Sequence, residues 1–182
     1  MRLRILGSSL LAAALFAMTA AAADKANTTP KTGDDLVKAV RHEIVMYPYY
    51  TLWDDINFRV DNGNVTLLGD VSQPYKKSDL QNIVKRVPGV ESVTNQLNVL
   101  PLSPNDDRLR IQVARAIFRD PNLSRYAMGA IPSIHIIVDN GQVKLTGAVA
   151  NAMDKQIAGM RASGAGLSFG TVDNQLTIDK RS

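Results

Sequence analysis

The sequence contains no cysteine, so neither disulfide bonds nor thiol chemistry can contribute to its stability or function. The lipid-carrying cysteine of a bacterial lipoprotein is excluded for the same reason. Histidine is scarce too, and neither His42 nor His135 has a second ligand at a spacing typical of a metal site. Ser-His-Asp and phosphate-loop patterns are also missing. The sequence therefore favours a protein that is not an enzyme and uses no cofactor or metal.

Long hydrophobic runs are absent except at the N-terminus. There, Arg2 and Arg4 precede an apolar stretch from Ile5 to Thr19, and Ala21-Ala22-Ala23 fits a small-residue cleavage site. The apolar stretch is too short for a membrane-spanning helix. We therefore predict a cleaved signal peptide at 1–23, export to the periplasm, and a mature chain without a transmembrane helix.

Net charge indicates no partner by itself. The chain has 21 basic and 17 acidic residues, a formal charge of +4. Removing Arg2 and Arg4 with the signal peptide leaves 19 basic residues and a charge of +2. A value this close to zero argues for neither nucleic acid nor an acidic substrate.

The chain repeats itself internally. The segment Asp61 to Val71 returns 78 residues later as Asp139 to Val149, with seven of eleven positions identical. A second segment, Val93 to Val99, returns as Val172 to Ile178 with an offset of 79. Because order and spacing agree, the sequence indicates a duplicated module.

Each copy predicts the element order helix, strand, strand, helix, strand. In the first copy, Asp34 or Asp35 is expected to cap a helix that Pro48 ends. Two strands of alternating polarity follow, joined by Asn62-Gly63, a pair that favours the type I′ turn of a hairpin. Asn140-Gly141 predicts the same turn in the second copy.

The rest of the module follows from similar signals. Ser72 is expected to cap the second helix, Pro88-Gly89 to end it, and residues 93–99 to form the third strand. Both helices should cover the apolar face of the sheet and leave the other face open to water. The predicted fold class is α+β, with two tandem αββαβ two-layer sandwich domains.

This pattern predicts the domain boundaries. They are a signal peptide at 1–23, a disordered leader at 24–33, a first domain at 34–100, a linker at 101–105 and a second domain at 106–180. Pro101 and Pro104 should stiffen the linker. Asn105, Asp106 or Asp107 is expected to cap the helix that follows.

Two motifs suggest a family. The hairpin reads Val-Asp-Asn-Gly-x-Val-x-Leu-x-Gly-x-Val in both copies, and residues 88–97 read Pro-Gly-Val-Glu-Ser-Val-Thr-Asn-Gln-Leu. Together with the element order, they resemble the BON family (bacterial OsmY and nodulation domain) in its dual-BON periplasmic form. In the second copy, residues 163–169 depart from the pattern where Pro-Gly-Val should stand.

The resemblance implies a non-enzymatic module of the cell envelope, often linked to osmotic or general stress. Its implied partners are phospholipid surfaces, here anionic ones, or other envelope components. The alternative is a protein-interaction or assembly module of the periplasm or outer membrane. The αββαβ order can also occur in KH-type RNA-binding domains, but the Gly-x-x-Gly loop between helices is missing, so no nucleic acid is expected. The oligomeric state stays open.

Several repeated residues are predicted to be structural. Gly69 and Gly147 lie at positions of the second strand whose side chains should point toward the core. A missing side chain there would allow a helix to approach or a bulge to form. Asn95 and Asn174 occupy positions of the third strand that should face the apolar side of the sheet. We expect their amides to hydrogen-bond the backbone, for example the loop before the hairpin, rather than a ligand.

Two loops could contact a partner. Tyr49, Tyr50 and Trp53 gather between the first helix and the hairpin, and Tyr126 lies in the corresponding loop of the second copy. The amphipathic side chains of tyrosine and tryptophan favour interfaces, but they can also cover the core of a small domain. Either loop could therefore meet lipid or the other domain.

The second copy is the more basic one. Residues 34–100 hold nine acidic and seven basic residues, whereas residues 104–182 hold seven acidic and ten basic residues. Arg108, Arg115 and Arg119 recur along one helix, with Arg110 and Arg125 nearby. A basic stripe could engage anionic head groups, although a solvated helix face gives the same pattern.

Overall fold

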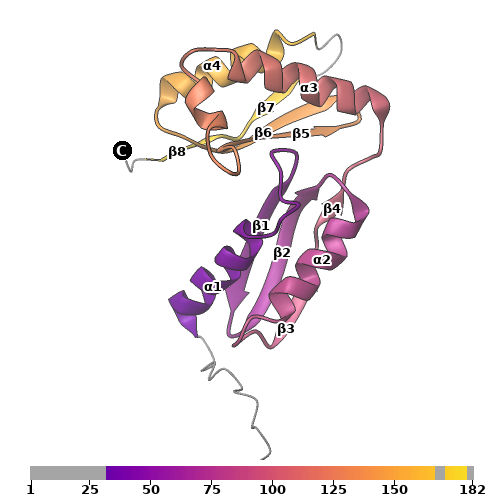
Figure 1. Ribbon diagram of the computed structural model, residues 1–182, viewed down its shortest axis with the longest axis vertical. Coiled ribbons are helices and arrows are strands. Elements are labelled where there is room, and N and C mark those ends of the chain that lie inside the picture. Colours follow the sequence, from indigo (N-terminus) through magenta and orange to yellow (C-terminus); the bar gives the residue numbers. More distant parts are fainter. Residues whose placement is uncertain (1–31, 167–170, 180–182) are drawn as a thin grey trace, which may run out of the picture.

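The computed structural model describes residues 32–166 and 171–179. The predicted signal peptide and nearly all of the predicted leader lie outside these residues. Within them the chain forms two units, each a small mixed sheet covered by two helices (Figure 1). The predicted α+β class with tandem αββαβ modules is confirmed.

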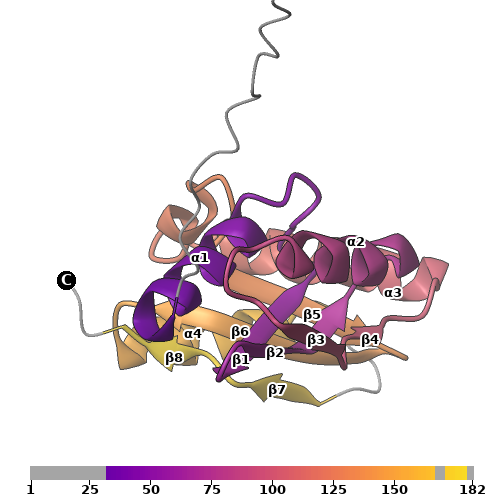
Figure 2. The same cartoon turned by 90° about the horizontal axis from the view of Figure 1, so that it is seen from below.

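The first unit follows the predicted order, with the third strand divided in two by a short break. Its elements are α1 (Gly33–Val45), β1 (Asp55–Asp61), β2 (Asn64–Val71), α2 (Pro74–Lys85), β3 (Ser92–Asn95) and β4 (Asn98–Val99). Strand β2 is central: it pairs antiparallel with β1 and parallel with β3 and β4. The helices α1 and α2 lie together on one side of this sheet (Figure 2).

The second unit repeats this plan and adds one short helix. Its elements are α3 (Pro104–Phe118), the 3-10 helix η1 (Ser124–Ala127), β5 (Ile134–Asp139), β6 (Gln142–Val149), α4 (Ala152–Ser163), β7 (Val172–Asn174) and β8 (Thr177–Ile178). Strand β6 takes the central place of β2. The hairpin turns are as predicted, since Asn62 and Asn140 have φ angles of 45° and 49°.

The helix caps differ from those predicted. Helix α1 begins at Gly33 after Thr32, so neither Asp34 nor Asp35 caps it, and it ends at Val45, before Pro48. Helix α2 follows Gln73, because Ser72 bonds elsewhere.

The cap of α3 also differs. Ser103 accepts the hydrogen bond from the Asp106 amide, so none of the three residues proposed from the sequence caps this helix. The helix consequently begins at Pro104, inside the predicted linker.

Each unit has its own core between the sheet and the helices. In the first, both helices and the sheet contribute fully buried side chains, for example Leu36 on α1, Leu67 on β2 and Leu80 on α2. In the second, the corresponding core contains Val113 and Leu145. Because each unit has its own hydrophobic core, each is a separate domain.

The part of the second sheet's outer face formed by β5 and β6 is covered, contrary to the prediction that this face is open to water. His135, Ile137 and Thr146 point to that face, yet each is at least nine-tenths buried. Figure 1 shows the reason: the sheet β5–β6 of the second domain faces the end of the first domain, and α3 and α4 lie on its far side. The domain interface, not solvent, covers this part of the sheet.

Candidate functional site

The loop between α1 and β1 forms the centre of the domain interface. The Leu52 carbonyl accepts a hydrogen bond of 2.8 Å from the Ile136 amide of β5. The Tyr50 ring stacks on the His135 imidazole with 5.5 Å between centroids. Leu52 and Trp53 pack against the second domain's core. This loop therefore fastens one domain to the other.

A salt bridge supports the same interface. The Lys144 ammonium of β6 lies 2.6 Å from the Asp70 carboxylate and 4.0 Å from that of Asp55, both in the first domain. All three side chains are largely shielded from water. Backbone, aromatic and ionic contacts thus act together across the two domains.

The aromatic residues predicted to meet a partner have divided roles. Tyr50 and Trp53 contact the second domain, so they are not available for lipid. Tyr49 is 57% exposed and meets Tyr47 and Tyr75 edge to face. Of the first loop's candidates, Tyr49 is the residue on the molecular surface.

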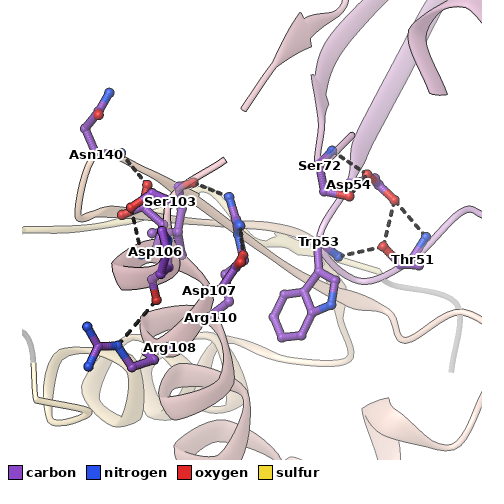
Figure 3. A network of polar contacts seen from close by, with 12 residues as sticks. Thr51, Trp53, Asp54, Ser72, Ser103, Asp106, Asp107, Arg108, Arg110 and Asn140 are labelled. Atoms are coloured by element: carbon purple, nitrogen blue, oxygen red, sulfur yellow. Dashed lines mark hydrogen bonds and ion pairs between the residues drawn. The ribbon is translucent and has the colours of Figure 1, made fainter. Parts of the chain in front are cut away.

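A buried polar cluster holds the interface loop in place (Figure 3). Lys76 on α2 and Asp54 are almost completely buried and joined by a 2.6 Å salt bridge. Asp54 also accepts hydrogen bonds from the backbone amides of Ser72 and Thr51 and from both of their hydroxyls. Burial acts to raise the pKa of Asp54, but the hydrogen bond from Lys76, followed by those from Ser72 and Thr51, outweighs burial and holds that pKa below its ordinary value. We call Asp54, Lys76, Ser72 and Thr51 the loop clamp.

The second domain has a counterpart with the charges reversed. At the helix position that corresponds to Lys76, α4 carries Asp154, which binds Arg125 and the Tyr126 hydroxyl. The Tyr126 hydroxyl also accepts from the Ala150 amide, as Asp54 does from Ser72. Tyr126 and Arg125 therefore serve the second domain's own structure.

The arginines of α3 separate into two groups. Arg108, Arg115 and Arg119 are exposed, whereas Arg110 is only 5% exposed. Arg110 donates a 2.9 Å hydrogen bond to the Val138 carbonyl and pairs with Asp107. The prediction that Arg110 belongs to a binding surface is therefore wrong, because its guanidinium is directed into the fold.

Apolar side chains accompany the exposed arginines. Ile111 on α3 is 44% exposed, and Met153 and Met160 on the neighbouring helix α4 are 64% and 65% exposed. We call Arg108, Ile111, Arg115, Arg119, Met153 and Met160 the helical face. Met153 and Met160 were not predicted from the sequence, although their seven-residue spacing on one helix places them on the same side.

The repeated glycines are required by the hairpin itself. Gly69 and Gly147 have φ angles of 110° and 102°. A Cβ atom on either would lie about 2 Å from the carbonyl oxygen of Asp55 or Ser133. A neighbouring strand, rather than a helix, occupies the space. Gly89 also has a positive φ angle, of 99°, in the turn after α2.

The repeated asparagines fasten each third strand to its helix. Asn95 donates to the Lys77 carbonyl, and Asn174 to the Lys155 carbonyl, both at 2.7 Å. Each also accepts from the backbone amide two residues further on. The partners are backbone groups, but they belong to α2 and α4 rather than to the loop before the hairpin.

The buried His135 should make stability depend on pH. Burial lowers the pKa of His135 against the opposing attraction of Asp55 and of the Asp54 and Thr51 carbonyls. Because the unfolded chain binds this proton more tightly, the contribution is complete above pH about 6.5 and declines as the pH falls. We expect His135→Gln to reduce the loss of Tm between about pH 7 and pH 5.

His42 on α1 is exposed and lies outside the interface, so His42→Gln is the matched control. It should keep the parent's full loss of Tm over the same range. If His135→Gln also keeps the full loss, the histidine does not contribute to the pH dependence.

The described part of the chain has neither a membrane-spanning helix nor a cluster of metal ligands. Within residues 32–166 and 171–179, every helix is too short or too polar to span a bilayer. In the same part of the chain, no three acidic or histidine side chains gather in a way that could hold a metal ion.

Two solved structures are similar to this chain at low sequence identity. Two solved structures of CdsD, a structural protein of the type III secretion system of Chlamydia trachomatis, are each 16% identical to this chain. One match covers 80% of this chain and 94% of the other, with a TM-score of 0.28. The second, to the C-terminal domain of CdsD, covers 82% and 100%, with a TM-score of 0.29.

No curated protein matches the chain. The BON domain family model, however, matches residues 34–101 and 105–180, which together form most of the sequence. These ranges coincide with the two αββαβ units. BON domains are associated with membrane and phospholipid binding and are generally not catalytic. The chain therefore belongs to the BON family and carries two BON domains.

Proposed function

We propose that this protein is a non-enzymatic component of the cell envelope that binds anionic phospholipid surfaces through the helical face of its second domain. The observation that carries the proposal is the composition of that face. Three exposed arginines stand beside three exposed apolar side chains on two adjacent helices. Interfacial helices combine basic and apolar residues in this way.

The position of the helical face supports the same function. Figure 1 shows α3 and α4 on the side of the second domain that faces away from the first. A flat membrane could therefore approach these helices without meeting the first domain. The arginines would contact head groups, and Met153 and Met160 would enter the boundary with the acyl chains.

Charge reversal on α3 tests the proposal. A basic residue near an anionic membrane contributes about 1 kcal/mol, so Arg115→Glu/Arg119→Glu should weaken binding by at least about 30-fold. The measurement is co-sedimentation with vesicles of phosphatidylcholine alone or mixed with phosphatidylglycerol. The parent should bind the mixed vesicles only, and salt should weaken that binding.

A control must change the total charge equally. Lys85 and Arg86 are exposed at the end of α2 in the first domain. Lys85→Glu/Arg86→Glu should bind anionic vesicles nearly as well as the parent. Equal binding of the parent to both vesicle types, or equal losses in both variants, would contradict the assignment to the helical face.

A second candidate function is protein interaction in the periplasm or outer membrane. It is favoured by an apolar group on the first domain, formed by Met46, Tyr49 and Tyr75, which are 63%, 57% and 47% exposed. Tyr49→Ser/Tyr75→Ser should leave vesicle binding unchanged under the lipid proposal. If this variant instead abolishes envelope association in cells while Arg115→Glu/Arg119→Glu does not, protein interaction is the better account.

The proposed location is the periplasm, reached through the signal peptide at 1–23, with a role in osmotic or general stress. Its support is the sequence pattern of the N-terminus and the family's association with stress proteins. Mass spectrometry of the protein from a periplasmic extract tests this: the mature chain should begin at Asp24.

A further inference from the structure

In the second domain, an arginine seals the place where the first helix meets the edge of the sheet. Strand β5 is the edge strand, and the Arg110 guanidinium donates a 2.9 Å hydrogen bond to the Val138 carbonyl at that edge. The guanidinium also pairs with the Asp107 carboxylate. One cation therefore satisfies a main-chain carbonyl and a carboxylate at the same time.

The first domain lacks this arginine. Buried core residues align the two helices with an offset of 73 residues: they are Val40 and Ile44 on α1, and Val113 and Ile117 on α3. At this offset Asp34 corresponds to Asp107, but Val37 stands in the place of Arg110. The carboxylate is thus kept and the cation is missing.

The main-chain acceptor is kept as well. Val60 pairs with Val65 in the first hairpin, as Val138 pairs with Val143 in the second. The Val60 carbonyl therefore points to the outer edge of β1, as the Val138 carbonyl points to the outer edge of β5. Among the described residues, none donates a hydrogen bond to it.

A hollow takes the place of the missing arginine. It has a volume of about 580 Å³, and Asp34, Val37 and Val60 all line it. Asp61 and Glu91 add two further carboxylates, and no basic residue of the described chain contributes to the lining. The hollow thus combines negative charge with apolar side chains, a combination that suits the aliphatic stem and the cationic head of arginine.

A guanidinium fits these acceptors better than an ammonium does. Its planar fork presents several N–H groups in fixed directions, so it can donate to a carbonyl and a carboxylate together. The second domain shows this pair of contacts with Val138 and Asp107. Val60 and Asp34 are the corresponding acceptors in the first domain.

We propose that the hollow of the first domain binds a guanidinium group, supplied either by an arginine side chain of a polypeptide or by a small alkylguanidine. The guanidinium donates to the Val60 carbonyl and the Asp34 carboxylate, and its stem packs on Val37. The ligand thereby makes from outside the contacts that Arg110 makes within the second domain. The helical face belongs to the second domain, so this inference does not rest on lipid binding.

The experiment is an NMR titration of the ¹⁵N-labelled chain at low salt with agmatine and, separately, with a Gly-Arg-Gly peptide blocked at both ends. The amide signals of Val37, Asp61 and Asn62 should shift with at least one of them, with a Kd on the order of 1 mM. Tighter binding of agmatine supports the small ligand, and tighter binding of the peptide supports the arginine side chain.

A peptide with citrulline in place of arginine is the control ligand, because citrulline has nearly the same shape and no charge. It should leave all three signals unshifted. Equal shifts with citrulline, or no shift with either guanidinium compound, would overturn the proposal.

Two single variants test which carboxylate binds. Asp34→Asn should weaken agmatine binding about threefold to fivefold, as expected for a partly exposed charge pair. Asp35→Asn removes the same charge from the neighbouring residue, which lies outside the hollow and pairs with Lys38. It should bind agmatine nearly as well as the parent. Equal losses in both variants would contradict the assignment to the hollow.

A third variant fills the site from within. Val37→Arg restores the arginine of the second domain, so it should abolish agmatine binding without lowering Tm. The unchanged Tm shows that the loss does not come from unfolding. If Val37→Arg binds agmatine as tightly as the parent, the ligand does not occupy the hollow.

Discussion

Replacing Lys76 with methionine is expected to lower the free energy of unfolding by about 3–5 kcal/mol. Lys76 is 3% exposed, and its ammonium is the cation beside the fully buried Asp54. Methionine keeps the length of the side chain but leaves the carboxylate without its counter-charge. The hydrogen bonds from Ser72 and Thr51 remain, yet they cannot neutralise the charge.

Urea denaturation of Lys76→Met and of Asp54→Asn/Lys76→Met measures the effect. The double variant should recover much of the loss, because the amide at 54 carries no charge and can still accept the Ser72 bonds. A loss below about 1 kcal/mol for Lys76→Met would show that water reaches Asp54 and that the clamp is not dry.

Replacing Gly147 with alanine should cost about 3–5 kcal/mol, combining backbone strain with overpacking. The backbone has a φ angle of 102°, and the new Cβ atom would lie 2.1 Å from the Ser133 carbonyl oxygen. That oxygen accepts a hydrogen bond from the Ala148 amide, so it cannot move away without breaking the sheet.

Gly141 is the matched control because it shares the positive φ angle but has open space around its Cβ position. Gly141→Ala should cost only the conformational strain, about 1–2 kcal/mol. Thermal unfolding of both variants separates the two effects. If they lose equal stability, the close contact with Ser133 does not contribute.

The fold could be predicted from the sequence because its signals are local. Alternating strands around Asn62-Gly63, and their return at Asn140-Gly141, specify each hairpin without reference to the rest of the chain. The caps were less predictable. Ser72 is a good capping residue, but Asp54, 18 residues away in sequence, takes its hydroxyl.

The docking of the domains could have been partly foreseen. Strand β1 alternates polar and apolar residues, whereas β5 contains Ile134, Ile136 and Ile137, which lie on both faces. A strand that is apolar on both faces is covered on both. The sequence could not identify what covers it, because Tyr50 and Leu52 reach β5 only through the tertiary fold.

The helical face could be predicted only in part, because its residues come from two helices. Arg110 lies three and seven residues before Val113 and Ile117, so helical spacing alone places it on the buried side. Arg115 and Arg119 are exposed as expected. Their companions Met153 and Met160 belong to α4, and only the packing of the two helices brings them to the same surface.

The reversed charges of the two buried clusters have a consequence for how the tandem chain reaches its native state. Similar repeats can exchange equivalent segments while folding. If α2 and α4 changed places, Lys76 would meet Arg125, and Asp154 would be buried against Asp54. The second encounter would bury two carboxylates against each other, and the first would bring two cations together where Arg125 is half exposed. Each copy therefore favours its own helix through the sign of one buried charge, and the exchanged pairing is destabilised by repulsion between like charges.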